Sequence, residues 1–210
     1  MAIDKITASA FADDAITADK INLADTFAFT GTVTGTPSDM VLLSTVDASS
    51  GTSAVVFNSS VVTTAYKNYY ITGHGIYAQT NSQTFRFYQS SDNGSSFTGD
   101  NKKTQFYQNL YGGGSSGQEQ ATVSGSGYFV MGSGISSSTV GGSCNIWVNG
   151  SNASNWKDIN YLFTHRNAGG QSYTYNGACE QQNGSAYNYF KFQMSSGNLY
   201  GYYYLFGLKG

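Results

Sequence analysis

Apolar side chains alternate with a period of two near the C-terminus, and this pattern constrains the fold more than any other feature of the chain. One run places Phe190, Phe192 and Met194 on the same face, and the turn signal Ser195-Ser-Gly-Asn198 follows it. The final run places Tyr200, Tyr202, Tyr204 and Phe206 on one face, and Leu199, Tyr203 and Leu205 on the other. A period of two indicates β-strands. We therefore predict a C-terminal hairpin whose last strand, apolar on both faces, is central in a sandwich or lies at an oligomer interface.

Similar patterns recur at short intervals from about Met40 onward. We predict further strands over residues 40–46, 53–57, 66–79, 83–89, 103–110, 121–131, 146–148 and 158–166. Loops rich in Gly and Ser separate them, and Asn93-Gly94 is a strong tight-turn signal. Many short strands joined by such loops are typical of an all-β fold. The predicted fold is an antiparallel β-sandwich with a jelly-roll-like topology.

Composition excludes several classes of protein. Charged residues make up only 10% of the 210-residue chain, and the formal net charge is −2. Nucleic-acid binding needs a surplus of Lys and Arg, so we expect no nucleic-acid partner. No apolar run approaches the ~20 residues of a membrane span, so we expect no membrane partner. The aromatic content of 15% argues against general disorder.

Residues 1–36 differ from the remainder and form a predicted N-terminal arm ahead of a sandwich domain over residues 37–210. The arm contains a weak repeat, because Asp4-Lys5-Ile6 returns as Asp19-Lys20-Ile21. Its apolar residues are scattered singly among small polar ones: Ile3, Ile6, Phe11, Ile16, Ile21 and Leu23. Such a segment cannot bury a core alone, so we expect these side chains to anchor the arm on a partner or on identical copies. A frayed tail is the alternative.

Residues that could carry chemistry are few. Asp158 and Glu180 are the pair of carboxylates that could act together, but nothing in the sequence brings them close. His74 and His165 show no metal-ligand spacing and are interpreted as ordinary strand residues. Cys144 and Cys179 are interpreted as two separate reduced thiols. We expect no catalytic residue, no cofactor and no metal.

Aromatic residues among Asn, Gln, Ser and Gly are the remaining candidates for binding. Flat rings beside amides suit stacking on sugars, and the glycan-binding candidates are Trp147, Trp156, Tyr173 and Tyr175. The same residue types suit a protein interface or a sandwich core. Tyr200, Tyr202, Tyr204 and Phe206 are the candidates for a trimer interface.

Three stretches carry a family resemblance: the Asp4-Lys-Ile-Thr7 and Ala15-Ile-Thr-Ala-Asp-Lys-Ile21 pair, Phe85-Arg-Phe-Tyr-Gln-Ser-Ser-Asp-Asn-Gly94, and Gly197-Asn-Leu-Tyr-Gly-Tyr-Tyr-Tyr-Leu-Phe-Gly-Leu-Lys209. Together they resemble structural proteins of tailed phages, cyanophages especially. The resemblance covers both ends and one internal hairpin. It implies a virion surface protein with a short N-terminal anchor and a C-terminal jelly roll, usually trimeric and without enzymatic activity.

The short arm leaves little chain for a long shaft. We therefore expect a homotrimeric capsid decoration protein, of the cement or head-fibre kind, anchored to the major capsid protein by the arm. The alternative is a tail fibre or receptor-binding protein whose jelly roll recognises a host-surface glycan. The N-terminus does not resemble a signal peptide, so we expect synthesis in the host cytoplasm and a final location on the virion surface.

Overall fold

The computed structural model shows an all-β domain, with no helix in the part of the chain that it describes. It describes residues 40–97, 101–109, 116–123, 127–152, 156–182 and 185–208. For 101–109 and 116–123 it gives the course of the backbone and not the side chains. None of these residues belongs to a helix long and apolar enough to cross a membrane. The predicted arm and the boundary after residue 36 lie outside the described residues.

Twelve strands follow one another along the described chain. They are β1 (Met40–Asp47), β2 (Val55–Phe57), β3 (Asn68–Ala78), β4 (Gln83–Ser90), β5 (Asn101–Asn109), β6 (Ser116–Val123), β7 (Tyr128–Ile135), β8 (Gly142–Asn149), β9 (Trp156–Arg166), β10 (Ser172–Gln182), β11 (Tyr189–Met194) and β12 (Leu199–Leu208).

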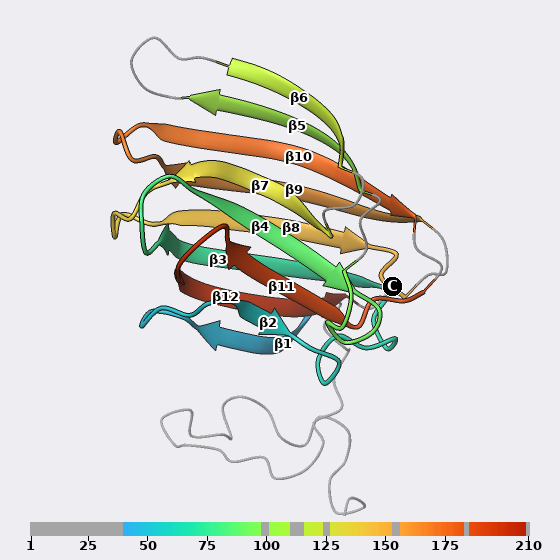
Figure 1. The fold of residues 1–210 in the computed structure, drawn as a ribbon. Coiled ribbons are helices and arrows are strands. Elements are labelled where there is room, and N and C mark those ends of the chain that lie inside the picture. Colours follow the sequence, from blue (N-terminus) through green and yellow to red (C-terminus); the bar gives the residue numbers. More distant parts are fainter. Residues whose placement is uncertain are drawn as a thin grey trace, which may run out of the picture. The chain divides into compact units, whose positions relative to one another are not determined.

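The strands form two antiparallel sheets that pack face to face (Figure 1). The large sheet has eight strands in the order β1-β12-β3-β8-β9-β10-β5-β6. The small sheet has four, in the order β2-β11-β4-β7, and Figure 1 shows them crossing in front of the large sheet. The predicted all-β sandwich is confirmed.

The strand pairs show the topology of a long antiparallel hairpin that is rolled up into two sheets. β1 pairs with β12, β2 with β11, β3 with β8 and β4 with β7, all antiparallel. Rolling this hairpin places β12 beside β3 and β11 beside β4, which divides the pairs between two sheets. These eight strands have the arrangement of a jelly roll, as the sequence predicts.

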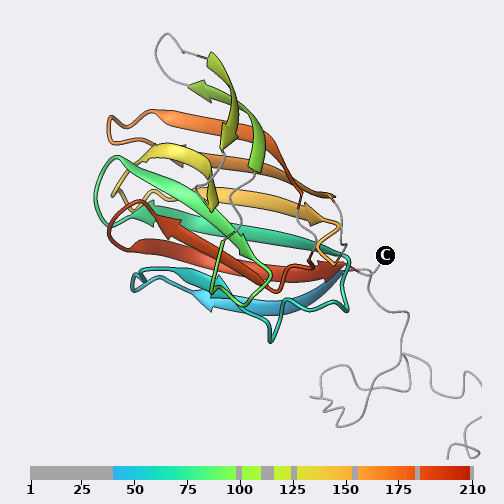
Figure 2. The same cartoon turned by 45° about the vertical axis from the view of Figure 1, so that its right-hand side comes forward.

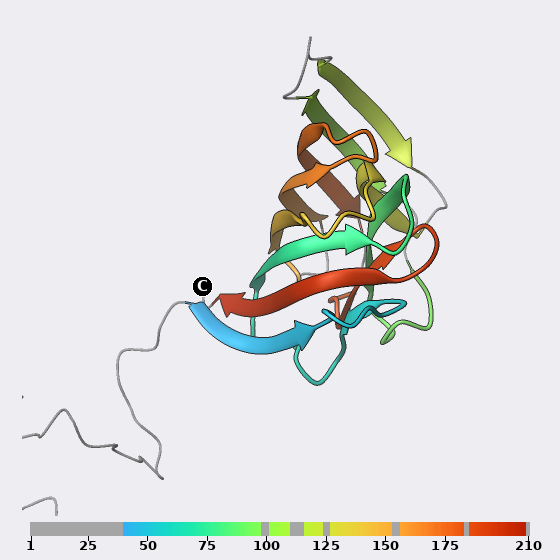
Figure 3. The ribbon, with the colours of Figure 1, turned by 90° about the vertical axis from the view of Figure 1, so that its left-hand side faces the viewer.

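Two insertions enlarge one sheet only. The β9–β10 hairpin adds to the edge of the large sheet beside β8, and the β5–β6 hairpin adds beside β10. The small sheet has no counterpart to these strands. Figures 2 and 3 show the β5–β6 hairpin beyond the strands that the small sheet covers.

Aromatic side chains fill the space between the sheets. Phe192 is fully buried, with its ring centroid 4.8 Å from that of Phe87 and 5.5 Å from those of Phe85 and Tyr203. Phe85 also lies 4.9 Å from Phe163 of β9. The predicted grouping of side chains by face in the last two strands is confirmed, because Phe190, Phe192, Met194, Leu199, Tyr203 and Leu205 are all buried.

A β-bulge in β3 changes which of its side chains share a face. The sequence places Tyr69, Ile71, Gly73, Gly75 and Tyr77 on one face, but Gly75 is an extra residue in the ladder, with φ of +65°. As a result Tyr69 and Ile71 point into the core, whereas Tyr77 points away from it and Ile76 takes its inward place. Glycine adopts such a positive φ without strain.

Two strand predictions are wrong. Residues 121–131 do not form one strand, because β6 ends at Val123 and β7 begins at Tyr128. The strand β10 is absent from the predicted set. The C-terminal hairpin is also wrong as a pairing: the turn at Ser195–Asn198 exists, but β11 and β12 belong to different sheets. The turn carries the chain from one layer to the other because each strand already pairs with earlier strands.

Close approach of β8 and β9 requires glycine at position 142. A Cβ added to Gly142 would lie 2.1 Å from the carbonyl oxygen of Thr164. Because that oxygen belongs to the backbone, moving side chains could not relieve the overlap. We expect Gly142→Ala to lower the free energy of unfolding by about 1–3 kcal/mol, as overpacking does elsewhere. Urea denaturation measures this loss. The matched control is Gly169→Ala, where the nearest atom to an added Cβ is 3.4 Å away. Equal stability of the two variants would contradict the close approach.

Candidate functional site

The outer face of the large sheet carries a dense set of exposed and half-buried aromatic and aliphatic side chains. These side chains alternate along their strands with the buried ones, and cross-strand register places them side by side. We call this set the aromatic face: Met40, Leu42, Tyr70, His74, Tyr77, Trp147, Leu162, Tyr200, Tyr202, Tyr204, Phe206 and Leu208. Five of them are large hydrophobic residues with more than a third of their surface exposed: Met40, Leu42, Trp147, Leu162 and Tyr202. The four predicted trimer-interface residues therefore lie together on one face.

The register shows how this face is built. In one row across the sheet, Leu42 of β1 lies beside Phe206 of β12, then Tyr70 of β3 and Trp147 of β8. In another row, Asp47 lies beside Tyr202, then His74 and Ser143. Residues in direct register project from the same side of the sheet. Residues from four strands therefore form one continuous surface.

The rings of the aromatic face stack on one another. Tyr77 and Tyr200 are nearly parallel, with an interplanar angle of 4° and centroids 4.4 Å apart. His74 stacks between Tyr202 at 5.1 Å and Tyr204 at 5.8 Å, and its Nε2 lies 3.3 Å from the hydroxyl oxygen of Tyr204. Trp147 packs on Tyr70 at 4.4 Å. The flat faces of these rings are therefore partly occupied by neighbouring rings.

The four predicted glycan-binding residues do not gather at one site. Trp147 belongs to the aromatic face, and the side chain of Trp156 lies outside the described residues. Tyr173 and Tyr175 have the inward orientation on β10. Tyr175 is only 7% exposed, so as a glycan-stacking residue it is a wrong prediction. Its alternation with polar residues gave no sign of whether it faced the core or solvent.

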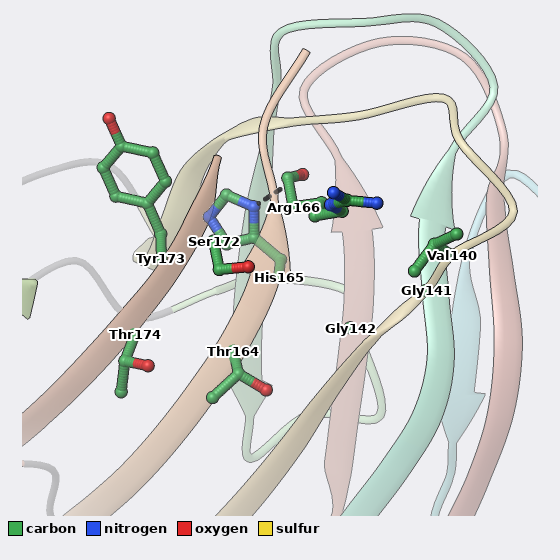
Figure 4. Close-up of a pocket in the computed structure, with 9 residues that line it drawn as sticks. All are labelled: Val140, Gly141, Gly142, Thr164, His165, Arg166, Ser172, Tyr173 and Thr174. Carbon is green, nitrogen blue, oxygen red and sulfur yellow. Dashed lines mark hydrogen bonds between the residues drawn. The ribbon is translucent and has the colours of Figure 1, made fainter. Parts of the chain in front are cut away.

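A depression of about 380 Å³ lies at one end of β9 and β10 (Figure 4). Its walls come from the start of β8 and from the residues beside the β9–β10 turn: Val140, Gly141, Gly142, Thr164, His165, Arg166, Ser172, Tyr173 and Thr174. Figure 4 shows the guanidinium of Arg166 extending toward Val140. The Nε–H of Arg166 donates to the carbonyl oxygen of Gly170 at 3.1 Å, which fixes the orientation of the guanidinium.

His165 is the buried member of this group. It is 4% exposed and stacks on Phe163, Tyr173 and Tyr175 with centroids 5.1–5.7 Å away. Its Nδ1–H donates to the carbonyl oxygen of Arg166 at 3.0 Å. Burial lowers the pKa of His165, while this hydrogen bond opposes the effect. His165 is therefore neutral in the fold at pH 7.

The stability of the fold should depend on pH through His165. Because its pKa is lower in the fold than the ~6.5 of the unfolded chain, its contribution is fully present above about pH 6.5 and is lost as the pH falls through the folded pKa. We expect His165→Phe, which keeps an aromatic ring in the stack, to lose less stability than wild type between pH 7.5 and pH 5. Urea midpoints at the two pH values measure this. An equal loss of stability in both proteins would mean that a group other than His165 causes the pH dependence.

Asp158 and Glu180 lie directly opposite one another on β9 and β10. Both are exposed on the outer face, and Asn149 of β8 lies beside Asp158 in the same row. The sequence contained no sign of this pairing, because strand register decides it. The depression lies at the other end of these strands and includes neither carboxylate. In the described part of the chain, no three His, Cys, Asp or Glu side chains gather in a group that could hold a metal ion.

The two cysteines lie on different strands of the large sheet and are not joined by a disulfide. Both are buried, and burial raises the pKa of the Cys144 thiol to about 12. A thiol with such a pKa is inert at neutral pH. The interpretation as two separate thiols is confirmed.

Four members of the aromatic face were predicted from the sequence to be interface residues. Most of the other members were not predicted to be at an interface. Met40, Leu42, Tyr70 and Leu162 were assigned to strands without a face, and the bulge at Gly75 hid the outward position of Tyr77. One sequence signal could have placed Tyr70 on the outer face. Tyr70, Thr72 and His74 alternate with Tyr69, Ile71 and Gly73, which are the buried residues of β3.

Comparison with known proteins found nothing similar at a significant level: no family model, no curated protein and no solved structure matches this chain.

Proposed function

We propose that this chain is a non-enzymatic structural protein of a bacteriophage virion, which assembles as a homotrimer through its aromatic face and decorates the capsid. The arm, residues 1–36, would anchor each copy to the major capsid protein. The observation that carries the proposal is the exposed aromatic face on β1, β12, β3, β8 and β9. The jelly-roll topology supports it, because viral capsid domains use this architecture, as do lectins.

The size of the aromatic face suits a protein interface. Strands spaced about 4.8 Å apart, with a rise of about 3.3 Å per residue, give four strands of eight residues a flat area of roughly 400–500 Å². Apolar patches of roughly 300–600 Å² are the largest on most monomers and are often functional. Side chains project above this flat surface, so the area that a partner contacts is larger than the flat area. This brings it toward the ~800 Å² per partner of a standard interface.

The composition of the face favours a second copy of the chain as its occupant. Tyrosine and tryptophan are enriched at protein interfaces, and charged groups are depleted at their centres. Among the described side chains, the charged groups on the outer face are Asp47, Asp158, Glu180 and Arg166, and the last three lie toward the ends of β9 and β10. Two such faces, or one face and another neutral surface, can meet without burying an unpaired charge.

The stacking of the rings favours a protein partner over a sugar. A glycan platform needs a ring whose flat face is open to the sugar. Tyr77 and Tyr200 cover one another, and His74 lies between Tyr202 and Tyr204. Ring edges and hydroxyls are left at the surface, and these suit hydrogen bonding and packing against another protein.

The mass of the protein in solution tests the assembly. We expect light scattering during gel filtration to give a trimer at micromolar concentration. A monomer would overturn the proposed assembly, and a dimer would overturn the trimer while keeping the face as the contact. The position on the particle needs a second measurement: hundreds of copies labelled on the head support decoration, whereas about a dozen at the tail contradict it.

The alternative is a tail fibre or receptor-binding protein that recognises a host-surface glycan. The observation that favours it is the depression beside Tyr173, with the hydroxyls of Thr164, Ser172 and Thr174 around it. A glycan array probed with wild type and Tyr173→Ala tests this function. Binding that the substitution abolishes would support the alternative, and an array with no binding by wild type would remove it.

A further inference from the structure

The depression at the end of β9 and β10 contains a cation that has no counter-charge close by. Arg166 is the one residue with a permanent charge among the described residues that line it. Asp158, with Glu180 opposite it, is eight residues away along β9, which is roughly 26 Å at a strand rise of about 3.3 Å per residue. Asp47 is four strands away across the sheet, or roughly 19 Å. Both distances exceed the Debye length of about 8 Å at physiological ionic strength, so neither carboxylate neutralises Arg166.

Hydrogen bonds at the start of the β9–β10 turn hold Arg166 in place. Its carbonyl oxygen accepts from the backbone N–H of Ser136 and from the Nδ1–H of His165, both at 3.0 Å. Its Nε–H donates to the carbonyl oxygen of Gly170 at 3.1 Å. Within the described residues the two Nη groups have no hydrogen-bond partner, and a guanidinium edge of this kind binds both oxygens of a carboxylate. A group that is already oriented loses less conformational entropy when it binds a ligand.

Hydroxyl groups lie beside Arg166 on the same side of the sheet. Ser172 is directly opposite Arg166 in the β9–β10 ladder. Thr174 is opposite Thr164, two residues farther along each strand, and residues in direct register project from the same side. Ser143 of β8 continues this row, with its Oγ 2.9 Å from the Oγ1 of Thr164. Because a hydroxyl can both donate and accept, such a row suits a ligand that itself carries several hydroxyls.

The size and lining of the depression suit one sugar unit with a single negative charge. Its volume of about 380 Å³ is within the range of roughly 300–1,000 Å³ for small-molecule sites (Figure 4). Gly141 and Gly142 form a stretch of wall without side chains, and Val140, 57% exposed, adds an apolar rim. One guanidinium matches one carboxylate, whereas a polyanion such as a nucleic acid is bound through several cations.

We propose that this depression binds a sugar that carries a carboxylate, such as a hexuronic or sialic acid unit of a glycan. The two Nη groups of Arg166 bind the carboxylate, and the hydroxyls of Thr164, Ser172 and Thr174 bind those of the sugar. The inference goes beyond the proposed decoration of the capsid. It rests on the alternative function only in treating the depression as a site for sugars, and it adds the chemical class of the sugar. No contact between copies enters it.

A glycan array that isolates the carboxylate tests this inference. Carboxylated oligosaccharides are printed beside the same oligosaccharides after reduction of each carboxyl to a hydroxymethyl group. The full chain is applied at physiological salt as wild type, Arg166→Gln, Arg166→Lys and Lys67→Gln. Lys67 is exposed and outside the depression, so Lys67→Gln removes the same charge elsewhere. Bio-layer interferometry then gives dissociation constants for the tightest-binding pair, and near-UV circular dichroism shows that each variant is folded.

We expect wild type and Lys67→Gln to bind the carboxylated sugar at least tenfold more tightly than its reduced counterpart, which is the effect of a hydrogen bond to a charged group. Arg166→Gln should lose this preference. Arg166→Lys should keep only part of it, because an ammonium does not match both carboxylate oxygens as the planar guanidinium does.

The inference is overturned if wild type binds no sugar, or binds both members of the pair equally well. An equal loss in Lys67→Gln and Arg166→Gln would also overturn it, because general charge attraction would then explain the binding. Competition by polyglutamate as effective as that by the sugar, at equal carboxylate concentration, would show that the hydroxyls play no part and would have the same consequence. Binding of the reduced sugars alone, abolished by Tyr173→Ala, would overturn the inference and keep the alternative function.

Discussion

Tyr202→Glu is expected to convert the assembled protein into monomers at micromolar concentration. Tyr202 is 38% exposed on the aromatic face, where it lies in register with Asp47 on one side and His74 on the other. A glutamate here would bury an unpaired carboxylate beside an existing one. Leaving a charge unpaired in a desolvated interface costs about 3 kcal/mol or more, which is about a hundredfold or more in the dissociation constant.

The measurement is the mass of the variant by light scattering over a range of protein concentrations. The matched control is Val140→Glu, which introduces the same charge at a residue that is 57% exposed and outside the aromatic face. We expect the control to remain assembled. If Tyr202→Glu assembled as tightly as wild type, the aromatic face would not be the contact between copies, and the proposed function would lose the observation that carries it.

Phe192→Ala is expected to have the largest effect on stability. Its ring is fully buried between the sheets and contacts rings from both: Phe85 and Phe87 in the small sheet and Tyr203 in the large one. Truncation of a buried phenylalanine costs about 3–5 kcal/mol, because the transfer energy is lost and a cavity remains. For a domain of this size the melting temperature should fall by roughly 10 °C.

Thermal and urea unfolding at one fixed protein concentration measure this change, since assembly itself adds to stability. Val140→Ala, at an exposed residue, should change the free energy of unfolding by less than about 0.5 kcal/mol. A loss below about 1 kcal/mol for Phe192→Ala would mean that the two sheets do not pack through this ring.

The position of most strands could be predicted because alternation is a local signal. β1, β4 and β12 begin and end within a few residues of their predicted bounds. β10 was missed although Tyr173, Tyr175 and Cys179 alternate with polar residues. Gly177 weakens the strand signal in the middle of the segment, yet the fold requires it, because a Cβ there would lie 2.6 Å from the ring of Tyr161.

Pairing between strands could not be predicted in the same way. Alternation says which side chains share a face but not which strand lies alongside, so β11 and β12 were expected to pair with one another. The candidate sites show the same limit. The outward face of β12 was predicted from β12 alone, whereas the neighbours of Tyr202 and the position of Asp158 opposite Glu180 depend on register. Register is set by contacts between distant parts of the chain.

The rolled-up hairpin has a consequence for how the chain folds during its synthesis. Among the described strands β1 pairs only with β12, so the first of these strands to leave the ribosome has no partner until the twelfth emerges. At ~5–20 residues per second, the intervening stretch of about 160 residues takes roughly 8–30 s to make. Folds dominated by such distant pairings are also slow to form once complete. The large sheet therefore closes only after β12 has been made, and until then the backbone N–H and C=O groups of β1 lack their partners on that strand.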